Sequence, residues 1–217
     1  MAYTLVIGNK NTSSWSLRPW IAMKSAGIAF EVAKVNLRAA DAKQQILAQT
    51  PSGKVPALKC DGEVIWDSLA ILEFLAETHP EAKLWPQERI ARARARAVSC
   101  EMHAGFQALR QECPMDFLAR APREVLSDAC AADVRRIVAL WGECRARFGT
   151  GGPFLFGAFS AADAMYAPVV SRFATYVPDL ARYGDDGRAR DYVAAMLDLP
   201  AMQDWGAGAK AELGAKA

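Results

Sequence analysis

The chain has 217 residues, of which 52% are hydrophobic, and a formal net charge of +2 at pH 7. This length fits one or two domains, and this hydrophobic content is enough for a core and argues against global disorder. A nearly neutral charge disfavours nucleic acid or an anionic membrane surface as a partner. We expect no signal peptide and no membrane span, because no apolar run approaches the ~20 residues that a span needs.

The five cysteines are odd in number and scattered, with no CxxC pair among them. This distribution is typical of reduced thiols in a cytosol and not of a disulfide framework. The two histidines, His79 and His103, have no clustered cysteines beside them, so no metal site is expected. We therefore expect a cytoplasmic protein without a metal cofactor.

The first eighty residues predict alternating strands and helices. In chain order the patterns indicate strands over residues 3–7, 30–35, 55–60 and 63–66, and helices over residues 16–26, 41–49 and 67–78. The Asp61-Gly62 pair joins the last two strands as an antiparallel hairpin. The order β-α-β-α-β-β-α predicts a small mixed sheet with helices packed on it.

The rest of the chain predicts helices only. Residues 79–87 hold two prolines and Trp85, and we interpret 81–87 as a linker between a domain over 1–80 and an all-helical domain over 88–217. Helical patterns run over about 88–112, 123–148, 160–177 and 188–198. Ser160 and Asp163 form an S-x-x-D capping box at the start of the third of these helices, which we expect to be structural.

The alternating segment ARARARA, residues 91–97, is locally low in complexity. Alanine and arginine both favour helix, and on a helix Arg89, Arg92 and Arg96 fall on one side. We interpret this side as a solvated or subunit-facing surface. A nucleic-acid surface is the less favoured alternative, because no wider basic field supports it.

Hydroxyl groups gather in the loop after the first strand, where an open sheet binds its ligands. Ser13, Ser14 and Ser16 all lie close to the predicted start of a helix, with Pro19 shortly after them. Any one of these serines could simply cap the helix, but two or three exceed what one cap needs. A helix N-terminus also favours anions, including a thiolate.

A carboxylate and a hydroxyl, Asp67 and Ser68, begin the helix after the hairpin. Taken alone, the pair is better explained as a cap of that helix. As a ligand site, the pair would suit a molecule with both an ammonium and a carboxylate, because Asp67 would bind the first and Ser68, with the helix N–H groups, the second.

The segment GKVPAL places Pro56 inside a predicted strand, although proline has no N–H to donate to a sheet. An edge strand tolerates such a proline. If instead the Val55–Pro56 bond is cis, the N–H and C=O of Val55 are left free to pair with a peptide-like ligand as a short antiparallel strand.

Taken in order, these three motifs resemble the thioredoxin-like domain of glutathione S-transferases. TSSWSLRPWIAMKSAGI is similar, without a gap, to the SSCS region of the zeta class, and PSGKVPAL and DSLAILEFL are similar to recurrent motifs of the family. The resemblance covers the whole chain and is to bacterial, serine-type, zeta- or theta-like members. One position departs: Trp15 stands where the zeta pattern has cysteine, which argues against a cysteine-dependent thiol reductase and against the zeta isomerase activity.

The resemblance implies an α/β thioredoxin-like N-terminal domain followed by an all-α helical domain, in a homodimer that detoxifies small electrophiles. Glutathione would be the co-substrate, with no metal. A serine hydroxyl would donate a hydrogen bond to the glutathione thiolate, which then attacks the electrophile; the ungapped alignment assigns this role to Ser13, with Ser14 next. The implied glutathione-binding residues are Ser13, Lys54, Val55, Pro56, Asp67 and Ser68.

The second substrate would lie between the two domains, against the first helix of the helical domain. The segment EMHAGFQALR supplies the candidates Met102, His103, Phe106 and Arg110, although an ordinary core role is the favoured interpretation of any one of them. A non-enzymatic binding or regulatory protein of the same family is the alternative function, because fold alone does not settle activity.

Overall fold

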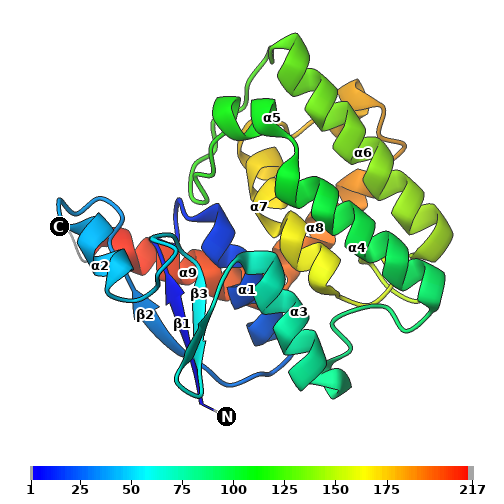
Figure 1. Cartoon of the computed structure of the whole chain (residues 1–217). Helices are drawn as coiled ribbons and strands as arrows, with labels where there is room; N and C mark the ends of the chain where they lie inside the picture. The colour runs from blue at the N-terminus through cyan, green and yellow to red at the C-terminus, as the bar shows by residue number, and fades with distance from the viewer. Residues whose placement is uncertain (1, 215–217) are drawn as a thin grey trace.

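The computed structural model describes residues 2–214, and it has a small sheet domain beside a larger helical domain (Figure 1). The sheet has the order β2-β1-β3-β4, with β1 at Tyr3–Ile7, β2 at Glu31–Lys34, β3 at Ala57–Cys60 and β4 at Glu63–Ile65. Strand β1 pairs in parallel with β2 and antiparallel with β3, and β3 pairs antiparallel with β4. The predicted mixed sheet and its hairpin are confirmed.

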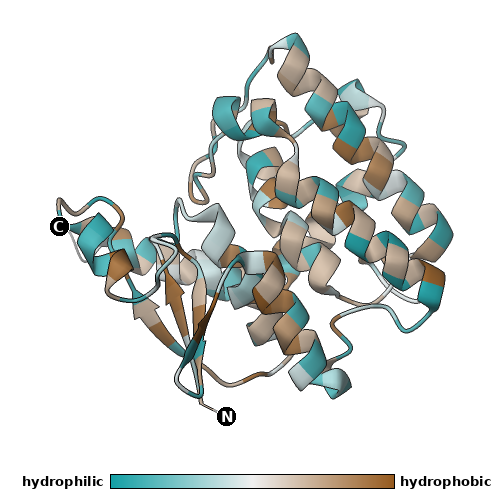
Figure 2. Cartoon of the chain, in the orientation of Figure 1, coloured by the Kyte–Doolittle hydropathy of each residue, from teal (hydrophilic) through white to brown (hydrophobic). Residues whose placement is uncertain are grey.

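Three helices cover the two faces of this sheet: α1 (Ser14–Ser25), α2 (Ala42–Leu47) and α3 (Ser68–Thr78). Successive side chains of a strand point to opposite faces. Leu5 and Ile7 of β1 therefore join the large core that includes α1 and α3, whereas Val6 packs with Ile46 of α2 on the other face. Figure 2 shows β1 mainly in the brown of apolar residues, and its Leu5, Val6 and Ile7 are fully buried.

The second domain is helical. Its helices are α4 (Arg89–Ala104), α5 (Gln107–Glu112), α6 (Asp128–Phe148), α7 (Ala161–Tyr176), α8 (Arg188–Asp198) and α9 (Pro200–Gly214), with the short 3-10 helices η1 (Pro80–Ala82) and η2 (Leu180–Tyr183). Helix α7 is buried along nearly its whole length. The predicted capping box at its start is present, since Ser160 N and Oγ each lie 2.8 Å from Asp163 Oδ2.

Several predicted boundaries are corrected by the structure. The single helix predicted over 88–112 is two helices, because Gly105 and Phe106 interrupt it and Phe106 has a left-handed φ of 62°. Helix α1 begins two residues earlier than predicted, at Ser14, so Pro19 lies inside it. Helix α9 was not predicted at all; three glycines lower its helix propensity, but Trp205 and other apolar residues bury one of its faces.

The two domains pack through α1, which lies against α7 and α9. The indole Nε1 of Trp205 donates to Lys10 O at 2.8 Å, and the ion pair Lys24–Asp204 spans 3.2 Å. Helix α9 thus ties the helical domain to the loop that precedes α1. Among residues 2–214, no helix has the length and apolar character to cross a membrane.

The arginines of α4 make contacts within the chain. Arg96 forms a two-bond ion pair with Glu73 of α3, at 2.8 and 3.0 Å, and Arg92 donates to the carbonyl oxygens of Pro86 and Gln87. These two side chains therefore hold the segment between the domains against α3 and α4. A subunit contact on this side of α4 stays a prediction.

Candidate functional site

A cavity of about 500 Å³ opens between the sheet domain and α4 of the helical domain. It is lined by Trp15, Ser52, Lys54, Val55, Pro56, Trp66, Asp67 and His103. Four of the residues predicted to bind glutathione are in this set, namely those of the GKVPAL motif and Asp67. The structure therefore brings the second and third sequence motifs together around one space of ligand size.

The main chain at Val55 is unpaired. Strand β3 begins only at Ala57, which pairs with Val6, and the peptide bond between Val55 and Pro56 is cis. Across the described part of the chain, neither the N–H nor the C=O of Val55 takes part in a hydrogen bond. One donor and one acceptor are thus available at the cavity wall.

The start of α3 combines a bonded carboxylate with an unbonded hydroxyl. Asp67 is the N-cap: its Oδ1 accepts from Leu69 N at 3.1 Å, and its Oδ2 lies 3.0 Å from His103 Nε2 on α4. Ser68 is fully buried, and its Oγ has no hydrogen-bond partner within residues 2–214. A buried hydroxyl without a partner lowers stability, so the Ser68 hydroxyl is available to a hydrogen-bond acceptor that approaches the start of α3.

The serines at the start of α1 differ in their hydrogen bonding. Ser13 Oγ donates to Ser16 Oγ at 2.8 Å, and Ser16 Oγ in turn accepts from Gly8 N at 3.1 Å. Ser14 is the first residue of α1, and its Oγ makes no hydrogen bond to any described residue. Neither Ser13 nor Ser14 is among the residues that line the cavity, although their neighbour Trp15 is.

Trp15 forms a wall of the cavity with cationic groups around its ring. The guanidinium carbons of Arg18 and Arg110 lie 4.2 and 5.1 Å from the ring centroid, and the ring of His103 approaches it edge-on at 5.2 Å. Arg18 is only 1% exposed, and its pKa is lowered by burial and by the neighbouring positive charges of Arg110 and Arg172.

The predicted second-substrate residues separate into two groups. Met102 and Phe106 are buried, at 1% and 7% exposure, and belong to the hydrophobic core. Arg110 donates to the carbonyl oxygens of Gly105 and Met102. Of the four, only His103 is among the residues that line the cavity.

Three cavity residues were missed by the sequence reasoning, namely Trp15 as a wall, Ser52 and Trp66. Each is adjacent in sequence to a residue of one of the three motifs, and this adjacency could have identified it as a candidate lining residue. Helical spacing also places Trp15 and Arg18 on one side of α1, which signals their cation–π contact. In residues 2–214, no group of three or more His, Cys, Asp or Glu side chains is arranged to hold a metal ion.

Two family models match the chain. One, described as "Glutathione S-transferase, N-terminal domain", covers residues 12–78, and the other, "Glutathione S-transferase, C-terminal domain", covers residues 87–205. The chain belongs to the glutathione S-transferase family. The two matches leave a short gap in which most of the predicted linker at 81–87 lies; the linker and the domain bounds around it stay predictions.

Curated relatives match over part of their length. The chain is 40% identical over 100 residues to a probable maleylacetoacetate isomerase from Caenorhabditis elegans, a stretch that covers 46% of each chain. It is 38% identical over 121 residues to the maleylacetoacetate isomerase of Rhizobium meliloti (strain 1021), which covers 55% of each. The chain thus spans about half the length of the curated relatives it matches.

Solved structures show the same fold along nearly the whole chain. A glutathione transferase homologue from Burkholderia gl BGR1 with bound glutathione superposes with a TM-score of 0.71 at 22% identity, covering 97% of this chain and 98% of that one. Glutathione transferase Omega 2S from Trametes versicolor gives a TM-score of 0.70 at 23% identity, covering 99% and 97%. At this identity the likeness establishes the fold alone.

Proposed function

We propose that the chain is a glutathione transferase that binds glutathione in the cavity between its domains and directs the thiolate at a small electrophilic carbon. The observation that carries this proposal is the unpaired main chain of Val55, which lines one cavity with Asp67 in a chain of this family. Ser68, which follows Asp67 in sequence, is not among the lining residues, but its buried hydroxyl has no partner within residues 2–214. A peptide-like ligand with an ammonium and a carboxylate matches those groups one by one.

In this arrangement the cysteinyl residue of glutathione pairs with the N–H and C=O of Val55 as a short antiparallel strand. The γ-glutamyl ammonium binds the carboxylate of Asp67. The γ-glutamyl carboxylate accepts hydrogen bonds from the first N–H groups of α3 and from the hydroxyl of Ser68, where the helix N-terminus also favours negative charge. Lys54, at the cavity wall, supplies a positive charge for the second carboxylate of the tripeptide.

A serine at the start of α1 then favours the thiolate. A free thiol has a pKa of about 8.5, so only a few per cent is ionised at pH 7. A hydroxyl that donates to sulfur at a helix N-terminus stabilises the ionised form. The sequence alignment favours Ser13 for this role, whereas the hydrogen bonding favours Ser14, because the hydroxyl of Ser13 is already donated to Ser16.

A second candidate reaction is suggested by the relatives, which are named maleylacetoacetate isomerases. There the thiolate would add to a conjugated cis double bond, rotation about the resulting single bond would follow, and loss of the thiolate would restore the trans double bond. Glutathione is regenerated in this reaction and consumed in conjugation. The same glutathione cavity serves both reactions, and the difference lies in whether the thiolate leaves again.

The test begins with glutathione binding, measured by calorimetry and by retention on immobilised glutathione. Turnover is then followed with 1-chloro-2,4-dinitrobenzene and, separately, with maleylacetone as a cis-enedione. Formation of the dinitrophenyl conjugate supports the transferase, and isomerisation with glutathione unchanged supports the second reaction. Binding without either turnover would favour a non-enzymatic role, and absence of binding would refute the proposed site.

We also propose that the protein is a cytoplasmic homodimer with a role in detoxification. The scattered cysteines support a reducing compartment. In the dimer, the arginine-bearing side of α4 would meet the sheet domain of the second subunit about a two-fold axis. Light scattering at micromolar concentration should give twice the mass of the chain, and a monomeric mass would contradict the dimer.

A further inference from the structure

One residue of the helical domain reaches the glutathione cavity. Within residues 2–214, the lining consists of seven residues from the sheet domain and of His103, which lies one residue before the end of α4. Its Nε2 lies 3.0 Å from Oδ2 of Asp67, the carboxylate that we assign to the γ-glutamyl ammonium. The helical domain therefore contacts the cavity at the group that would bind this ammonium.

The hydrogen bonding of the His103 ring specifies its donor. An ionised carboxylate can only accept, so Nε2 donates to Asp67. Nδ1 is buried and has no hydrogen-bond partner among the described residues, so a second N–H there would be a buried donor without an acceptor. The neutral ring with its proton on Nε2 fits both observations. Such a ring orients Asp67 and leaves its negative charge uncancelled.

Asp67 needs this orientation because its side chain is 52% exposed. A carboxylate with this exposure and no partner would sample several rotamers, and a ligand would have to fix one of them at a cost in affinity. Here both of its oxygens are held, since Oδ1 accepts from Leu69 N at 3.1 Å and Oδ2 accepts from His103 Nε2. Each oxygen keeps a second lone pair for the ammonium.

The position of His103 is fixed by its own surroundings. The guanidinium of Arg110 donates to Gly105 O at 2.9 Å and to Met102 O, and it therefore holds the last turn of α4. The ring of Trp15 meets the His103 ring edge-on, with the two centroids 5.2 Å apart. The imidazole is thus held by an arginine of its own domain and by an aromatic ring of the sheet domain.

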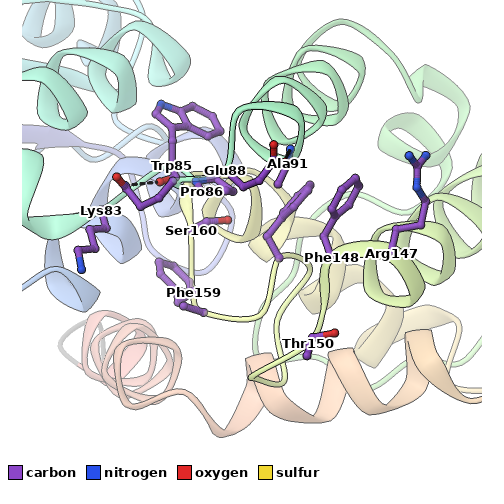
Figure 3. Close-up of a pocket in the computed structure, with 13 residues that line it drawn as sticks. Lys83, Trp85, Pro86, Glu88, Ala91, Arg147, Phe148, Thr150, Phe159 and Ser160 are labelled. Atoms are coloured by element: carbon purple, nitrogen blue, oxygen red, sulfur yellow. Dashed lines mark hydrogen bonds between the residues drawn. The ribbon is translucent and has the colours of Figure 1, made fainter.

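The rest of α4 is held in place as well. Glu88 is its N-cap and accepts hydrogen bonds from two N–H groups of the first turn; Figure 3 shows Glu88 and Ala91 at this end of the helix. In the middle of α4, Arg96 bonds Glu73 of α3 at 2.8 and 3.0 Å. Helix α4 is therefore fixed against the same helix that carries the ammonium-binding carboxylate at its start, so the distance from His103 to that carboxylate is set by the fold.

We propose that His103 is a positioning residue for glutathione, which orients the carboxylate of Asp67 toward the γ-glutamyl ammonium. This inference rests on the proposed function, and it differs from the role that the family resemblance implies for His103, which is contact with the second substrate. The two roles separate in measurement. A residue that acts through Asp67 changes the binding of glutathione, whereas a residue that contacts the electrophile changes the KM of the electrophile or kcat.

The experiment compares two ligands by calorimetry: glutathione, and glutaryl-cysteinylglycine, the analogue that lacks the γ-glutamyl ammonium. His103→Phe keeps a ring and removes the donor. It should weaken glutathione binding by about threefold to tenfold and change the affinity for the analogue by less than about twofold, because the analogue gives Asp67 no cation to bind. His103→Gln should recover most of the glutathione affinity, since its amide can donate to Asp67 as the imidazole does.

Four outcomes decide the proposal. An equal loss for both ligands in His103→Phe would overturn it, because the effect would not pass through the ammonium. A further loss of glutathione affinity when His103→Phe is added to Asp67→Ala would overturn it for the same reason. Glutathione binding by the parent and His103→Phe alike would refute the role of His103 and leave the proposed function standing. Absence of glutathione binding in the parent would refute the proposed function itself.

His79→Phe is the matched control. His79 is the other histidine of the chain, its side chain is 25% exposed against 27% for His103, and its Nδ1 lies 3.2 Å from Glu81 Oε1. It lies at the far end of α3, outside the glutathione cavity. The variant should bind both ligands as the parent does. A loss of glutathione affinity equal to that of His103→Phe would show that the effect is not specific to His103 and would overturn the proposal.

Kinetics give the second readout, with 1-chloro-2,4-dinitrobenzene or maleylacetone, whichever turns over. In His103→Phe the KM for glutathione should rise by about threefold to tenfold, while kcat and the KM for the electrophile stay those of the parent. A lower kcat or a higher KM for the electrophile, with the KM for glutathione unchanged, would assign His103 to the second substrate and overturn the proposal. The midpoint of thermal unfolding is measured for each variant, and His103→Leu replaces His103→Phe in every comparison if the latter fails to fold.

Discussion

Helices α7 and α1 both begin at serines, but their polar groups are used differently. At α7 the carboxylate of Asp163 accepts from Ser160 N, Ser160 Oγ and Leu155 N, all buried. At α1 the N-cap Ser13 makes no side-chain bond to the helix main chain, and Ser14 Oγ has no partner among the described residues. At the start of α7 the polar side chains bond one another and the main chain. At the start of α1 the hydroxyl of Ser14 has no hydrogen-bond partner among the described residues.

The difference separates residues that serve the fold from residues available to a ligand. Where every buried donor has a partner, a substitution removes stability. Where a hydroxyl is left without one, a substitution removes little from the fold and acts on what binds there. Helix α3 belongs with α1 in this respect, because Ser68 Oγ is buried and unbonded. Each prediction below tests whether stability and ligand binding separate in this way.

The largest effect is expected for Asp163→Ala. The substitution leaves two buried N–H groups and a hydroxyl without an acceptor, so the free energy of unfolding should fall by at least about 3 kcal/mol. Asp128→Ala, in the exposed first turn of α6, is the matched control and should cost less than about 1 kcal/mol. Urea denaturation measures both. A loss in Asp163→Ala no larger than that of the control would contradict a structural role for the capping box.

Asp163 should also make stability depend on pH. Burial raises the pKa of this carboxyl from 3.8 to about 6, so the folded state holds its proton more tightly than the unfolded chain does. The contribution of the group to stability is therefore complete below pH 4 and falls as the pH rises from about 4 to about 6. Asp163→Asn removes this titration, so the difference in unfolding free energy between parent and variant should change across that window and stay level above it.

The next effect concerns the open start of α1. If a serine donates to the thiolate, its removal costs about 1.5–3 kcal/mol, and the rate of conjugation at pH 7 should fall roughly ten- to a hundredfold. We expect the larger loss in Ser14→Ala and the smaller in Ser13→Ala, because only the hydroxyl of Ser14 is free. The loss should shrink as the pH rises past the thiol pKa, and glutathione affinity should change little.

The measurement is kcat/KM against pH for Ser13→Ala, Ser14→Ala and the parent with 1-chloro-2,4-dinitrobenzene. The reverse order of losses would assign the role to Ser13, as the sequence alignment does, and leave the mechanism standing. Parent-like activity of both variants over the whole range would show that neither Ser13 nor Ser14 stabilises the thiolate.

A smaller effect is expected for Asp67→Ala. The loss of a charge-assisted hydrogen bond to the γ-glutamyl ammonium should weaken glutathione binding by about tenfold. Asp61→Ala, in the turn between β3 and β4, is a matched control that should bind as the parent does. Calorimetry distinguishes the two. Equal glutathione affinities for Asp67→Ala and the parent would mean that the γ-glutamyl ammonium does not bind at the start of α3.

Much of the fold and of the candidate site could be predicted from local sequence signals. The features that could not be predicted depend on contacts between residues that are distant in sequence. The order of strands and helices over the first eighty residues follows from periodicity and turn chemistry, and the capping box follows from residue spacing. The pairing of His103 with Asp67, and of Trp15 with Arg110, joins elements of different domains, which no local pattern specifies. Helix α9 was missed because burial of Trp205 overrides the low propensity of its glycines.

The smallest effect is expected for Ser68→Ala. Its change in the free energy of unfolding should differ in sign from that of a serine whose hydroxyl is bonded at a helix start. The hydroxyl of Ser68 is buried without a partner, so its removal should leave the free energy of unfolding of the empty protein unchanged or slightly higher. Glutathione affinity should nevertheless fall about threefold to tenfold, because the γ-glutamyl carboxylate loses a donor.

Ser160→Ala at the start of α7 is the counterpart of Ser68→Ala, since each replaces one serine at a helix start. It should lose about 1 kcal/mol of stability and keep its glutathione affinity, because its hydroxyl bonds Asp163 and lies outside the glutathione cavity. Calorimetry gives the glutathione affinity and urea denaturation the unfolding free energy of each variant. We expect a loss of affinity only in Ser68→Ala and a loss of stability only in Ser160→Ala. Loss of stability in Ser68→Ala without loss of glutathione affinity would mean that the hydroxyl of Ser68 stabilises the folded protein and does not bind glutathione.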